Sequence, residues 1–284
     1  MLQRLAQVTT IVAVSLIALA ATTAVVMAAT ITGTDNRDKL RGTSSADTIA
    51  ALGGNDLVRA GGGDDQIDGG RGSDRLIGAD GNDTIRTGAG ALDFVAAGKG
   101  DDVITISKTG RGHGLLFAGP GNDTVTGGTG RDRLHGGDGN DIADGGAGRD
   151  LMSGGKGDDV QHGGAGNDLI FANLGADTSY GDDGNDVLWA VARGDVTADG
   201  SATVDTLVGG NGNDRIHTRD GEADRVDCGP GNDQAFVDLQ DVIVDATPEN
   251  LNGSCERVVR AAPKSDEDAA ENKTQSPKED KATS

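Results

Sequence analysis

The stretch Gly127-Gly128-Thr129-Gly130-Arg131-Asp132-Arg133-Leu134-His135, followed by Gly136-Gly137-Asp138-Gly139-Asn140-Asp141, repeats itself after nine residues. Two glycines open each unit, aspartate stands at position 6 and an apolar residue stands at position 8. Outward from this stretch the period extends over 22 units between residues 33 and 236, with short insertions between some units. Glycine replaces the aspartate at Gly114, and a unit at Asp195 keeps the phase across a second apparent gap. A fixed short period of this kind predicts a solenoid.

Each unit divides into a turn and a strand. The glycine-rich half can adopt the positive φ angles of tight turns and can point its carbonyl groups inward. The other three residues form a short strand, and the middle one, at position 8, points into the core. Gln161, Ser179 and Thr197 interrupt this apolar row, so we expect the poorest packing in the second half of the array. The row is otherwise Leu40, Ile49, Val58, Ile67, Leu76, Ile85, Val95, Ile104, Leu116, Val125, Leu134, Met152, Ile170, Leu188, Leu207, Ile216 and Val226, with the smaller Ala143 and Ala235.

One buried residue in nine makes a thin core. The chain has 48 glycines and 2% aromatic residues, and its 46 acidic against 25 basic residues give a net charge of −21. Ordering each residue costs about 1–2 kcal/mol of backbone entropy, and apolar burial returns about 25 cal/mol per Å². Burial alone therefore cannot hold this chain, and stacked acidic side chains oppose compaction further.

Bound calcium would compensate for both the thin core and the repulsion between stacked acidic side chains. It takes 6–8 oxygen ligands at roughly 2.3–2.6 Å, from carboxylates and backbone carbonyls, and a GGxGxD turn offers both groups. An EF-hand is excluded as the source of binding, because the glutamate that would close each acidic loop is replaced by Ala91, Arg149 and Arg193.

With these motifs, residues 33–236 resemble the RTX, or haemolysin-type, calcium-binding repeats. The resemblance implies an all-β fold, a parallel β-roll or β-helix solenoid of nonapeptide repeats. Two units would make one coil, and eleven coils at about 4.8 Å would give a rod on the order of 50 Å long. Calcium ions would lie between turns stacked on one edge, held by position-6 aspartates and turn carbonyls. One edge would carry Asp38, Asp56, Asp74, Asp93, Asp132, Asp150, Asp168, Asp186, Asp205 and Asp224, and the other Asp47, Asp65, Asp83, Asp102, Asp123, Asp141, Asp159, Asp177, Asp195, Asp214 and Asp233.

The candidate calcium ligands are graded by how complete their turns are. Asp38, Asp47, Asp177, Asp195 and Asp205 sit in eroded turns and are expected to contribute little, and Gly114 leaves a doubtful site between Asp93 and Asp132. The predicted calcium-binding residues are Asp56, Asp65, Asp74, Asp83, Asp102, Asp123, Asp132, Asp141, Asp150, Asp159, Asp168, Asp186, Asp214 and Asp233, with the turn glycines Gly128, Gly130, Gly137, Gly139, Gly146, Gly148, Gly155 and Gly157.

The amino-terminal segment, residues 1–28, has the features of a secretory signal peptide. Arg4 precedes an uncharged stretch over residues 8–27, and Val26-Met27-Ala28 forms a small-x-small cleavage pattern. We therefore expect a secreted, extracellular protein, where calcium is abundant. The stretch is also long enough to span a bilayer, so an uncleaved anchor at the cell surface is the alternative.

The two cysteines, Cys228 and Cys255, lie near the end of the repeats at residues 29–236. In an exported chain we expect them to form a disulfide, and two free thiols are the alternative. Residues 227–233 and 255–258 resemble the carboxyl-terminal cap of exported calcium-repeat proteins, so residues 237–260 are predicted to be a small disulfide-linked cap. The polar segment 261–284 is predicted to be a disordered tail.

Catalysis finds little support in the sequence. There is no HExxH, GxSxG, P-loop or CxxC motif, and paired acids such as Asp64-Asp65 recur as turn residues. The four histidines, His113, His135, His162 and His217, are interpreted as surface residues. We expect that the protein is not an enzyme.

The favoured function is an exported calcium-binding structural protein that binds multiple calcium ions and folds on binding them. The alternative is a calcium-stabilised adhesive or ice-binding solenoid, which needs a flat face of regularly spaced threonines. The position-7 threonines Thr48, Thr84, Thr124, Thr178 and Thr206 are scattered among other residue types, which favours the first function. Calcium is the expected partner, with association to a cell surface or matrix as a further expectation. No nucleic-acid partner is expected, and the sequence points to no protein partner.

Overall fold

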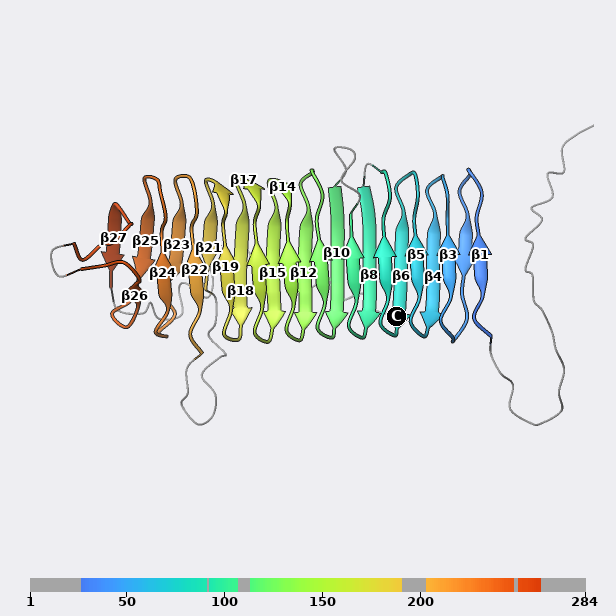
Figure 1. The fold of residues 1–284 in the computed structure, drawn as a ribbon, viewed down its shortest axis with the longest axis horizontal. Coiled ribbons are helices and arrows are strands. Elements are labelled where there is room, and N and C mark those ends of the chain that lie inside the picture. Colours follow the sequence, from blue (N-terminus) through green and yellow to red (C-terminus); the bar gives the residue numbers. More distant parts are fainter. Residues whose placement is uncertain (1–26, 91, 107–112, 191–202, 248–249, 262–284) are drawn as a thin grey trace, which may run out of the picture.

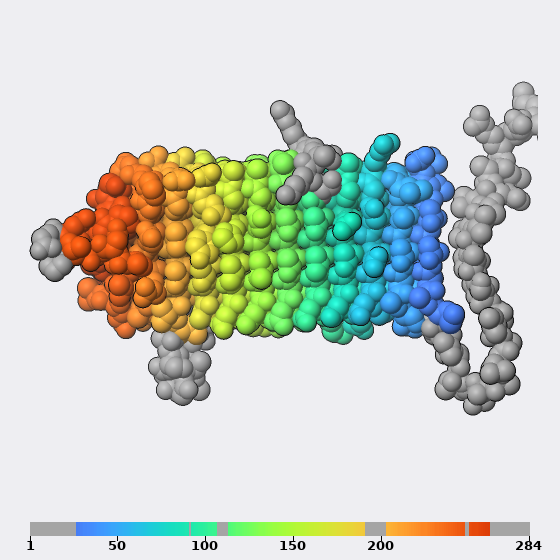
Figure 2. Space-filling view, in the orientation of Figure 1, coloured from blue at the N-terminus to red at the C-terminus, as the bar shows by residue number. Residues whose placement is uncertain are grey.

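The computed structural model describes residues 27–90, 92–106, 113–190, 203–247 and 250–261 as a single rod of stacked coils (Figure 1). The chain runs from β1 at one end to β27 at the other, and each coil lies against the next along the whole length (Figure 2). The described residues contain strands and turns and no helix, so the all-β prediction is confirmed.

Two parallel sheets of twelve strands form the long walls of the rod, corresponding to about eleven turns. Sheet A consists of β1 (Thr30–Thr32), β3 (Thr48–Ala50), β5 (Gln66–Asp68), β7 (Thr84–Arg86), β9 (Val103–Thr105), β11 (Thr124–Thr126), β13 (Ile142–Asp144), β16 (Val160–His162), β19 (Thr178–Tyr180), β22 (Thr206–Val208), β24 (Arg225–Asp227) and β26 (Val242–Ile243). Sheet B consists of β2 (Lys39–Arg41), β4 (Leu57–Gly62), β6 (Arg75–Asp80), β8 (Leu92–Lys99), β10 (His113–Pro120), β12 (Arg133–Asp138), β15 (Leu151–Lys156), β18 (Leu169–Leu174), β21 (Val187–Trp189), β23 (Arg215–Thr218), β25 (Gln234–Val237) and β27 (Arg257–Arg260).

A third, short sheet lies in the turns that precede sheet B. Sheet C pairs β14 (Ala147–Gly148), β17 (Ala165–Gly166) and β20 (Asp183–Gly184). The three strands come from successive turns of one edge; two of these turns open with two glycines, and the third opens with Gly181-Asp182, where Asp182 adopts the positive φ of 68° that the turn requires. The turns, as well as the strands, are therefore held in register between coils.

Most strands of sheets A and B begin at position 7, and β8 and β10 begin two residues earlier. Residues 7 and 9 point outward and residue 8 points inward. The pairing places each position-8 residue directly beside the one two units later, as with Ile49, Ile67 and Ile85 in sheet A. These inward residues are almost fully buried and form one continuous core. The row of core residues predicted from the period is confirmed along the described part of the chain.

The polar interruption of the core is satisfied internally. Gln161 and Ser179 are both 1% exposed and lie side by side in sheet A. In the amide orientation that suits its neighbours, the Gln161 nitrogen donates to Ser179 Oγ and to the Phe171 carbonyl oxygen, each at 3.1 Å, and its oxygen accepts the Gly154 N–H at 2.9 Å. The polar core residues thus bond to each other and to the backbone and leave no polar atom of Gln161 unpaired.

The predicted assignment of units to edges is wrong beyond Asp186. Strand β19 pairs with β22, and β21 pairs with β23, so the chain passes from sheet B at β21 to sheet A at β22. The predicted unit at Asp195 falls in residues 191–202, outside the described residues, and the strands on either side pair as though it were absent. Its core position would be the polar Thr197, so this unit would gain little by joining the stack. As a result Asp205 and Asp214 exchange edges relative to the prediction.

The carboxyl-terminal residues predicted to form a cap add one further strand to each sheet. Strand β26 pairs with β24, and β27 pairs with β25 over four residues. The predicted disulfide between Cys228 and Cys255 is present, with a Cα–Cα distance of 5.2 Å and a separation of 27 residues. Both cysteines are buried, so the bond ties the last strand of sheet B to the turn that follows β24.

The predicted signal peptide or anchor lies almost entirely in residues 1–26, and the predicted tail lies in residues 262–284. Both predictions fall outside the described residues. Within the described ranges, no helix long and apolar enough to cross a membrane is found.

Replacing both cysteines, as Cys228→Ser with Cys255→Ser, is expected to destabilise the calcium-loaded protein. Opening a loop of 27 residues restores freedom to the unfolded chain, worth about 3 kcal/mol in the chain-entropy model. Urea unfolding in excess calcium should therefore show a lower midpoint for the double variant and for reduced wild type. Midpoints that match the oxidised wild type would show that the last coil is held by packing alone.

Candidate metal centre

The position-6 aspartates form two files, one at the start of each sheet's strands. Within a file, the backbone N–H of each aspartate donates to Oδ1 of the aspartate one coil further on. Asp132 N lies 2.7 Å from Asp150 Oδ1, and Asp150 N lies 2.7 Å from Asp168 Oδ1. The sheet A file contains Asp47, Asp65, Asp83, Asp102, Asp123, Asp141, Asp159, Asp177, Asp205, Asp224 and Asp241. The sheet B file contains Asp38, Asp56, Asp74 and Asp93, then Asp132, Asp150, Asp168, Asp186, Asp214, Asp233 and Glu256.

The second carboxylate oxygen of most of these aspartates is buried and forms no hydrogen bond. Leaving a buried polar atom unpaired costs about 1–3 kcal/mol, and more when the group is charged. The same cost recurs in almost every turn, so it is a built feature of the repeat. The atoms concerned are Oδ2 of Asp56, Asp65, Asp74, Asp83, Asp102, Asp123, Asp141, Asp150, Asp159, Asp168, Asp186, Asp214, Asp224 and Asp233.

A backbone carbonyl of the next coil lies beside each of these free oxygens in the complete turns. A Cβ placed on Gly145, at position 1, would lie 2.9 Å from Asp150 Oδ2 and 2.6 Å from the Gly163 carbonyl oxygen. The next turn repeats the arrangement, where a Cβ on Gly163 would lie 2.8 Å from Asp168 Oδ2. Carboxylate and carbonyl oxygens therefore line the same small space, and these are the oxygen ligands that calcium takes.

Burial and like charge together raise the pKa of the file aspartates. Burial raises the pKa of Asp150 to about 7, with a further rise from the neighbouring carboxylates Asp168 and Asp132. The hydrogen bond from the Asp132 N–H opposes the rise. Asp186 shows the same causes, and its pKa rises to about 8. The rod without a cation thus disfavours the charged form of these carboxylates at neutral pH.

No described cluster of three or more acidic, histidine or cysteine side chains could enclose a metal ion. Each turn instead contributes one carboxylate and several backbone oxygens, and successive turns stack along the edge. Such an arrangement suits a hard cation shared between neighbouring coils. It offers neither sulfur nor a group of imidazoles, so a softer metal would find few of its preferred ligands.

The backbone N–H of a position-5 residue donates to the side chain of the position-5 residue one coil earlier, and these bonds keep the turns in register. Asn122 Oδ1 accepts the Asn140 N–H at 2.9 Å, and Asn140 Oδ1 accepts the Asp158 N–H at 3.0 Å. These side chains are exposed, so they are not candidates for the buried space. They fix the spacing of the position-6 carboxylates that follow them in the chain.

Of the fourteen aspartates predicted to bind calcium, thirteen have the buried, unpaired Oδ2. The exception is Asp132, whose Oδ2 accepts the Gly128 N–H at 2.9 Å. Gly137, Gly139, Gly146, Gly155 and Gly157 have positive φ, as their turns require. The remaining predicted glycines, Gly128, Gly130 and Gly148, lie in the same stacked turns, and Gly148 forms part of sheet C.

The aspartates of the incomplete turns differ from one another. Oδ2 of Asp38 and Oδ2 of Asp47 are already paired, because they accept the N–H groups of Thr34 and Thr43, each at 2.6 Å. Asp177 and Asp205 are instead as buried as the aspartates of complete turns and occupy the sheet A file. Gly114 does hold position 6, where its N–H donates to Asp132 Oδ1 at 2.6 Å. Because Gly114 has no carboxylate, the sheet B file is interrupted between Asp93 and Asp132, as the sequence predicts.

Sequence reasoning missed the last members of both files. Asp224 was placed on an edge but not among the ligands, yet its Oδ2 is buried and unpaired. Asp241 and Glu256 accept the N–H groups of Asp224 and Asp233 at 3.1 and 2.6 Å. Their distances along the chain depart from the period of 18, so a search by spacing passes over them. An acidic residue just before each final strand is the signal that could have found them.

A parallel β-solenoid with a buried carboxylate and backbone carbonyls in each turn defines a calcium-binding β-roll. The family model of RTX calcium-binding nonapeptide repeats matches residues 32–67, 59–91, 117–152, 126–161, 153–188 and 199–235. The chain therefore belongs to the RTX calcium-binding repeat family, and the predicted resemblance is confirmed.

Two further comparisons were made with known proteins. No curated protein matches the chain. Among solved structures, the chain is similar to a hyperactive, Ca²⁺-dependent, β-helical antifreeze protein from an Antarctic bacterium, with 21% identity, a TM-score of 0.34 and coverage of 80% of this chain and 95% of that chain.

The raised pKa values predict an unusual pH dependence in the absence of calcium. A group whose folded pKa lies above its unfolded pKa favours folding most at low pH, and that contribution is lost as pH rises through the folded value. Lowering the pH from 8 to 5 in chelator should therefore increase β-structure, since the pKa values of Asp150 and Asp186 are about 7 and 8. Far-UV circular dichroism across this pH range measures the β-structure. A loss of β-structure on acidification would contradict the inference that the carboxylates of the two files are buried in the folded rod.

Asp150→Asn tests the role of the buried charge. Asparagine keeps an oxygen for the Asp132 N–H but removes the negative charge, so fewer calcium ions should bind and a higher calcium concentration should be needed for folding. The matched control is Asp68→Asn, which makes the same charge change at an exposed position of β5. Isothermal titration should show a loss of about one to two ions for Asp150→Asn. Equal losses from both variants would show that only total charge matters.

Proposed function

We propose that the protein is an exported calcium-binding structural protein that folds into its β-roll as it binds multiple calcium ions. The observation that carries the proposal is the row of buried, unpaired Oδ2 atoms in two files of stacked turns. Membership of the RTX repeat family supports calcium as the cation.

The electrostatics of the files support the coupling of folding to binding. The chain has a net charge of −21, and the files place buried carboxylates one coil apart along both edges. Without a cation, each file combines like-charge repulsion with desolvation, and the thin core offers little to offset them. A bound calcium ion supplies the missing partner to Oδ2 and two positive charges. Ions that bind the folded state and not the unfolded chain stabilise it by mass action, and many sites multiply the effect.

Calcium should therefore convert the full chain from a largely unfolded to a β-rich state at neutral pH. Far-UV circular dichroism during a calcium titration measures the folding, and isothermal titration of the same sample measures the binding. Magnesium is the control cation, because it demands six ligands in strict octahedral geometry at 2.0–2.1 Å and should be less effective. Spectra that stay unchanged between chelator and excess calcium would contradict the proposal.

Export is supported by the amino-terminal sequence and by the disulfide. An oxidising compartment outside the cytosol favours a buried disulfide such as Cys228–Cys255, and extracellular fluid supplies calcium. An uncleaved anchor over residues 8–27 remains the alternative to secretion. In this proposal the protein acts through its calcium-dependent shape at a cell surface or in a matrix, and not as an enzyme.

An ice-binding or adhesive solenoid is the second candidate function. One observation from the strand pairing supports it more strongly than the sequence alone does. The position-7 threonines all lie on sheet A, whereas most of the residues that separated them in the sequence lie on sheet B. Their row is still interrupted by Gln66, Val103, Ile142 and Val160. Charged Asp68 and Arg86 stand beside it at position 9. The interrupted row keeps this function second to the calcium-dependent structural one.

A further inference from the structure

On the outer face of sheet B, positions 7 and 9 carry positive charge and no carboxylate. Asp80 and Asp138, at the ends of β6 and β12, are exposed but paired with Lys99 and Lys156. The strands of this sheet expose the side chains of positions 7 and 9, and none of these positions in the twelve described strands is aspartate or glutamate. Seven of them are cationic, and all seven are exposed. They are Lys39, Arg41, Arg59, Arg75, Arg133, Arg215 and Arg257.

This face contrasts with the rest of the protein. The whole chain has a net charge of −21, and the equivalent positions of sheet A include Asp68, Asp144 and Asp227. Both sheets are built from the same repeat, so the fold itself does not require the difference. The segregation of charge marks the outer face of sheet B as a surface suited to an anionic partner.

The positive charge is most concentrated beside a groove near the amino-terminal end. Arg41 and Arg59 are direct register partners on β2 and β4, so their side chains leave neighbouring strands about 4.8 Å apart. Like charges directly opposite on a sheet destabilise it. Neither guanidinium has an ion pair or side-chain hydrogen bond within the described residues.

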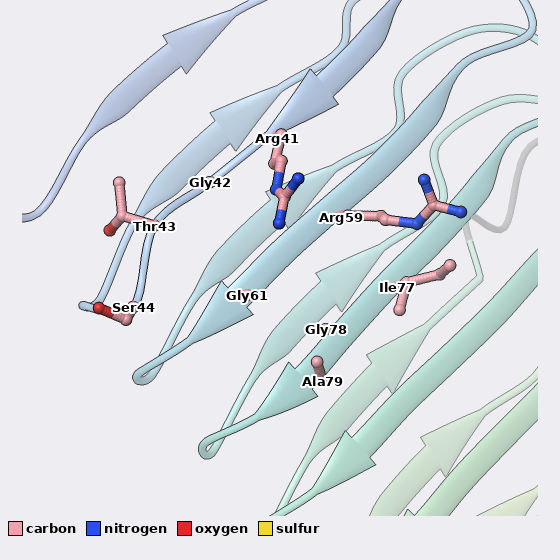
Figure 3. Close-up of a pocket in the computed structure, with 9 residues that line it drawn as sticks. All are labelled: Arg41, Gly42, Thr43, Ser44, Arg59, Gly61, Ile77, Gly78 and Ala79. Atoms are coloured by element: carbon pink, nitrogen blue, oxygen red, sulfur yellow. The ribbon is translucent and has the colours of Figure 1, made fainter. Parts of the chain in front are cut away.

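The groove itself has a volume of about 420 Å³. Figure 3 shows Arg41 and Arg59 above a floor that includes Gly61, Gly78 and Ala79. Thr43 and Ser44 lie at its end, and Ser44 adds a hydroxyl group, whereas the Thr43 hydroxyl already donates to Asp47 Oδ1 at 3.1 Å. The small residues leave space next to the two guanidinium groups, so a narrow ligand can approach both at once. A guanidinium group binds carboxylate or sulfate through two parallel hydrogen bonds.

We propose that the outer face of sheet B binds a linear anionic polysaccharide bearing sulfate or carboxylate groups, with Arg41 and Arg59 as its principal contacts. Beyond the groove, Arg75 on β6 extends the cationic row along the rod axis, and Arg133 on β12 follows after two coils that carry Phe94 and Leu115 at this position. Anionic groups repeated along an extended chain match cations repeated along a rod. The proposal rests on the fold and its charges and is independent of how many calcium ions bind.

Nucleic acid and lipid fit this face less well. Single-stranded nucleic acids need aromatic faces on which bases stack. Towards the carboxyl-terminal end of this face the rings stack on one another, with Trp189 and His217 3.8 Å apart and His217 and Phe236 4.7 Å apart. Nearer the groove, the Phe94 ring is covered by the Arg75 guanidinium at 4.6 Å. A lipid surface would favour cations spread over a plane, whereas here they are concentrated beside a narrow groove.

The test uses the full chain in calcium with immobilised dextran sulfate, carboxymethyl dextran and neutral dextran. We expect binding to one or both charged polymers and none to neutral dextran, and the preferred polymer identifies the anionic group. Arg41→Gln with Arg59→Gln should weaken binding about tenfold and lower the slope of log affinity against log salt by about two. The matched control, Arg86→Gln with Arg225→Gln, makes the same charge change on exposed positions of sheet A and should stay within about twofold of wild type.

Three results would overturn the proposal. The first is no binding of the calcium-loaded wild type to either charged polymer. The second is an equal loss from the sheet B and sheet A double variants, which would show attraction by overall charge. The third is binding to vesicles of anionic lipid without binding to the polymers. Circular dichroism and calcium titration of every variant separate a loss of this surface from a loss of the calcium-dependent fold.

Discussion

The structure depends on the burial of one carboxylate in almost every turn. One oxygen of that carboxylate accepts the backbone N–H of the preceding coil, so it joins the coils as a ladder hydrogen bond joins strands. The other oxygen is buried without a partner. The hydrogen bond to Oδ1 joins each coil to its neighbour, so stacking depends on the carboxylate. The unpaired Oδ2 makes the stacked state unfavourable unless a cation is present. These two roles of the carboxylate are the physical basis for the proposed coupling of folding to calcium binding.

Most of the fold follows from the period. The spacing of nine predicts which residue of each unit is buried, and the confirmed columns through Ile49 and Ile67 show how far a one-dimensional pattern determines a solenoid. The prediction failed at the unit around Asp195, which lies outside the described residues, because counting this unit as half a coil exchanges the two sheets for everything that follows Asp186. Counting also pooled the position-7 residues of both sheets, and only the pairing shows that the threonines share one wall.

The period constrains the turn and the core but leaves positions 7 and 9 free. At these positions the two walls of the rod differ most, with threonine and mixed charge on sheet A and cations without carboxylates on sheet B. A residue that neither stacks coils nor holds ions can vary without loss of the fold. The residues that distinguish this protein from other members of its family are therefore expected on the outer faces of the two sheets, away from the candidate calcium sites.

The ends of the rod show how a repeat can stop. Every coil needs an acceptor from its neighbour for the N–H at position 6, and the last coil has no further repeat to supply one. Asp241 and Glu256 provide it from segments that depart from the nonapeptide spacing. The disulfide from Cys228 to Cys255 holds Glu256 in place, since Cys255 is its neighbour in the chain. The end of the rod is thus held by the pairing of β27 with β25 and by a covalent bond, at the point where the nonapeptide spacing no longer places the last acceptor.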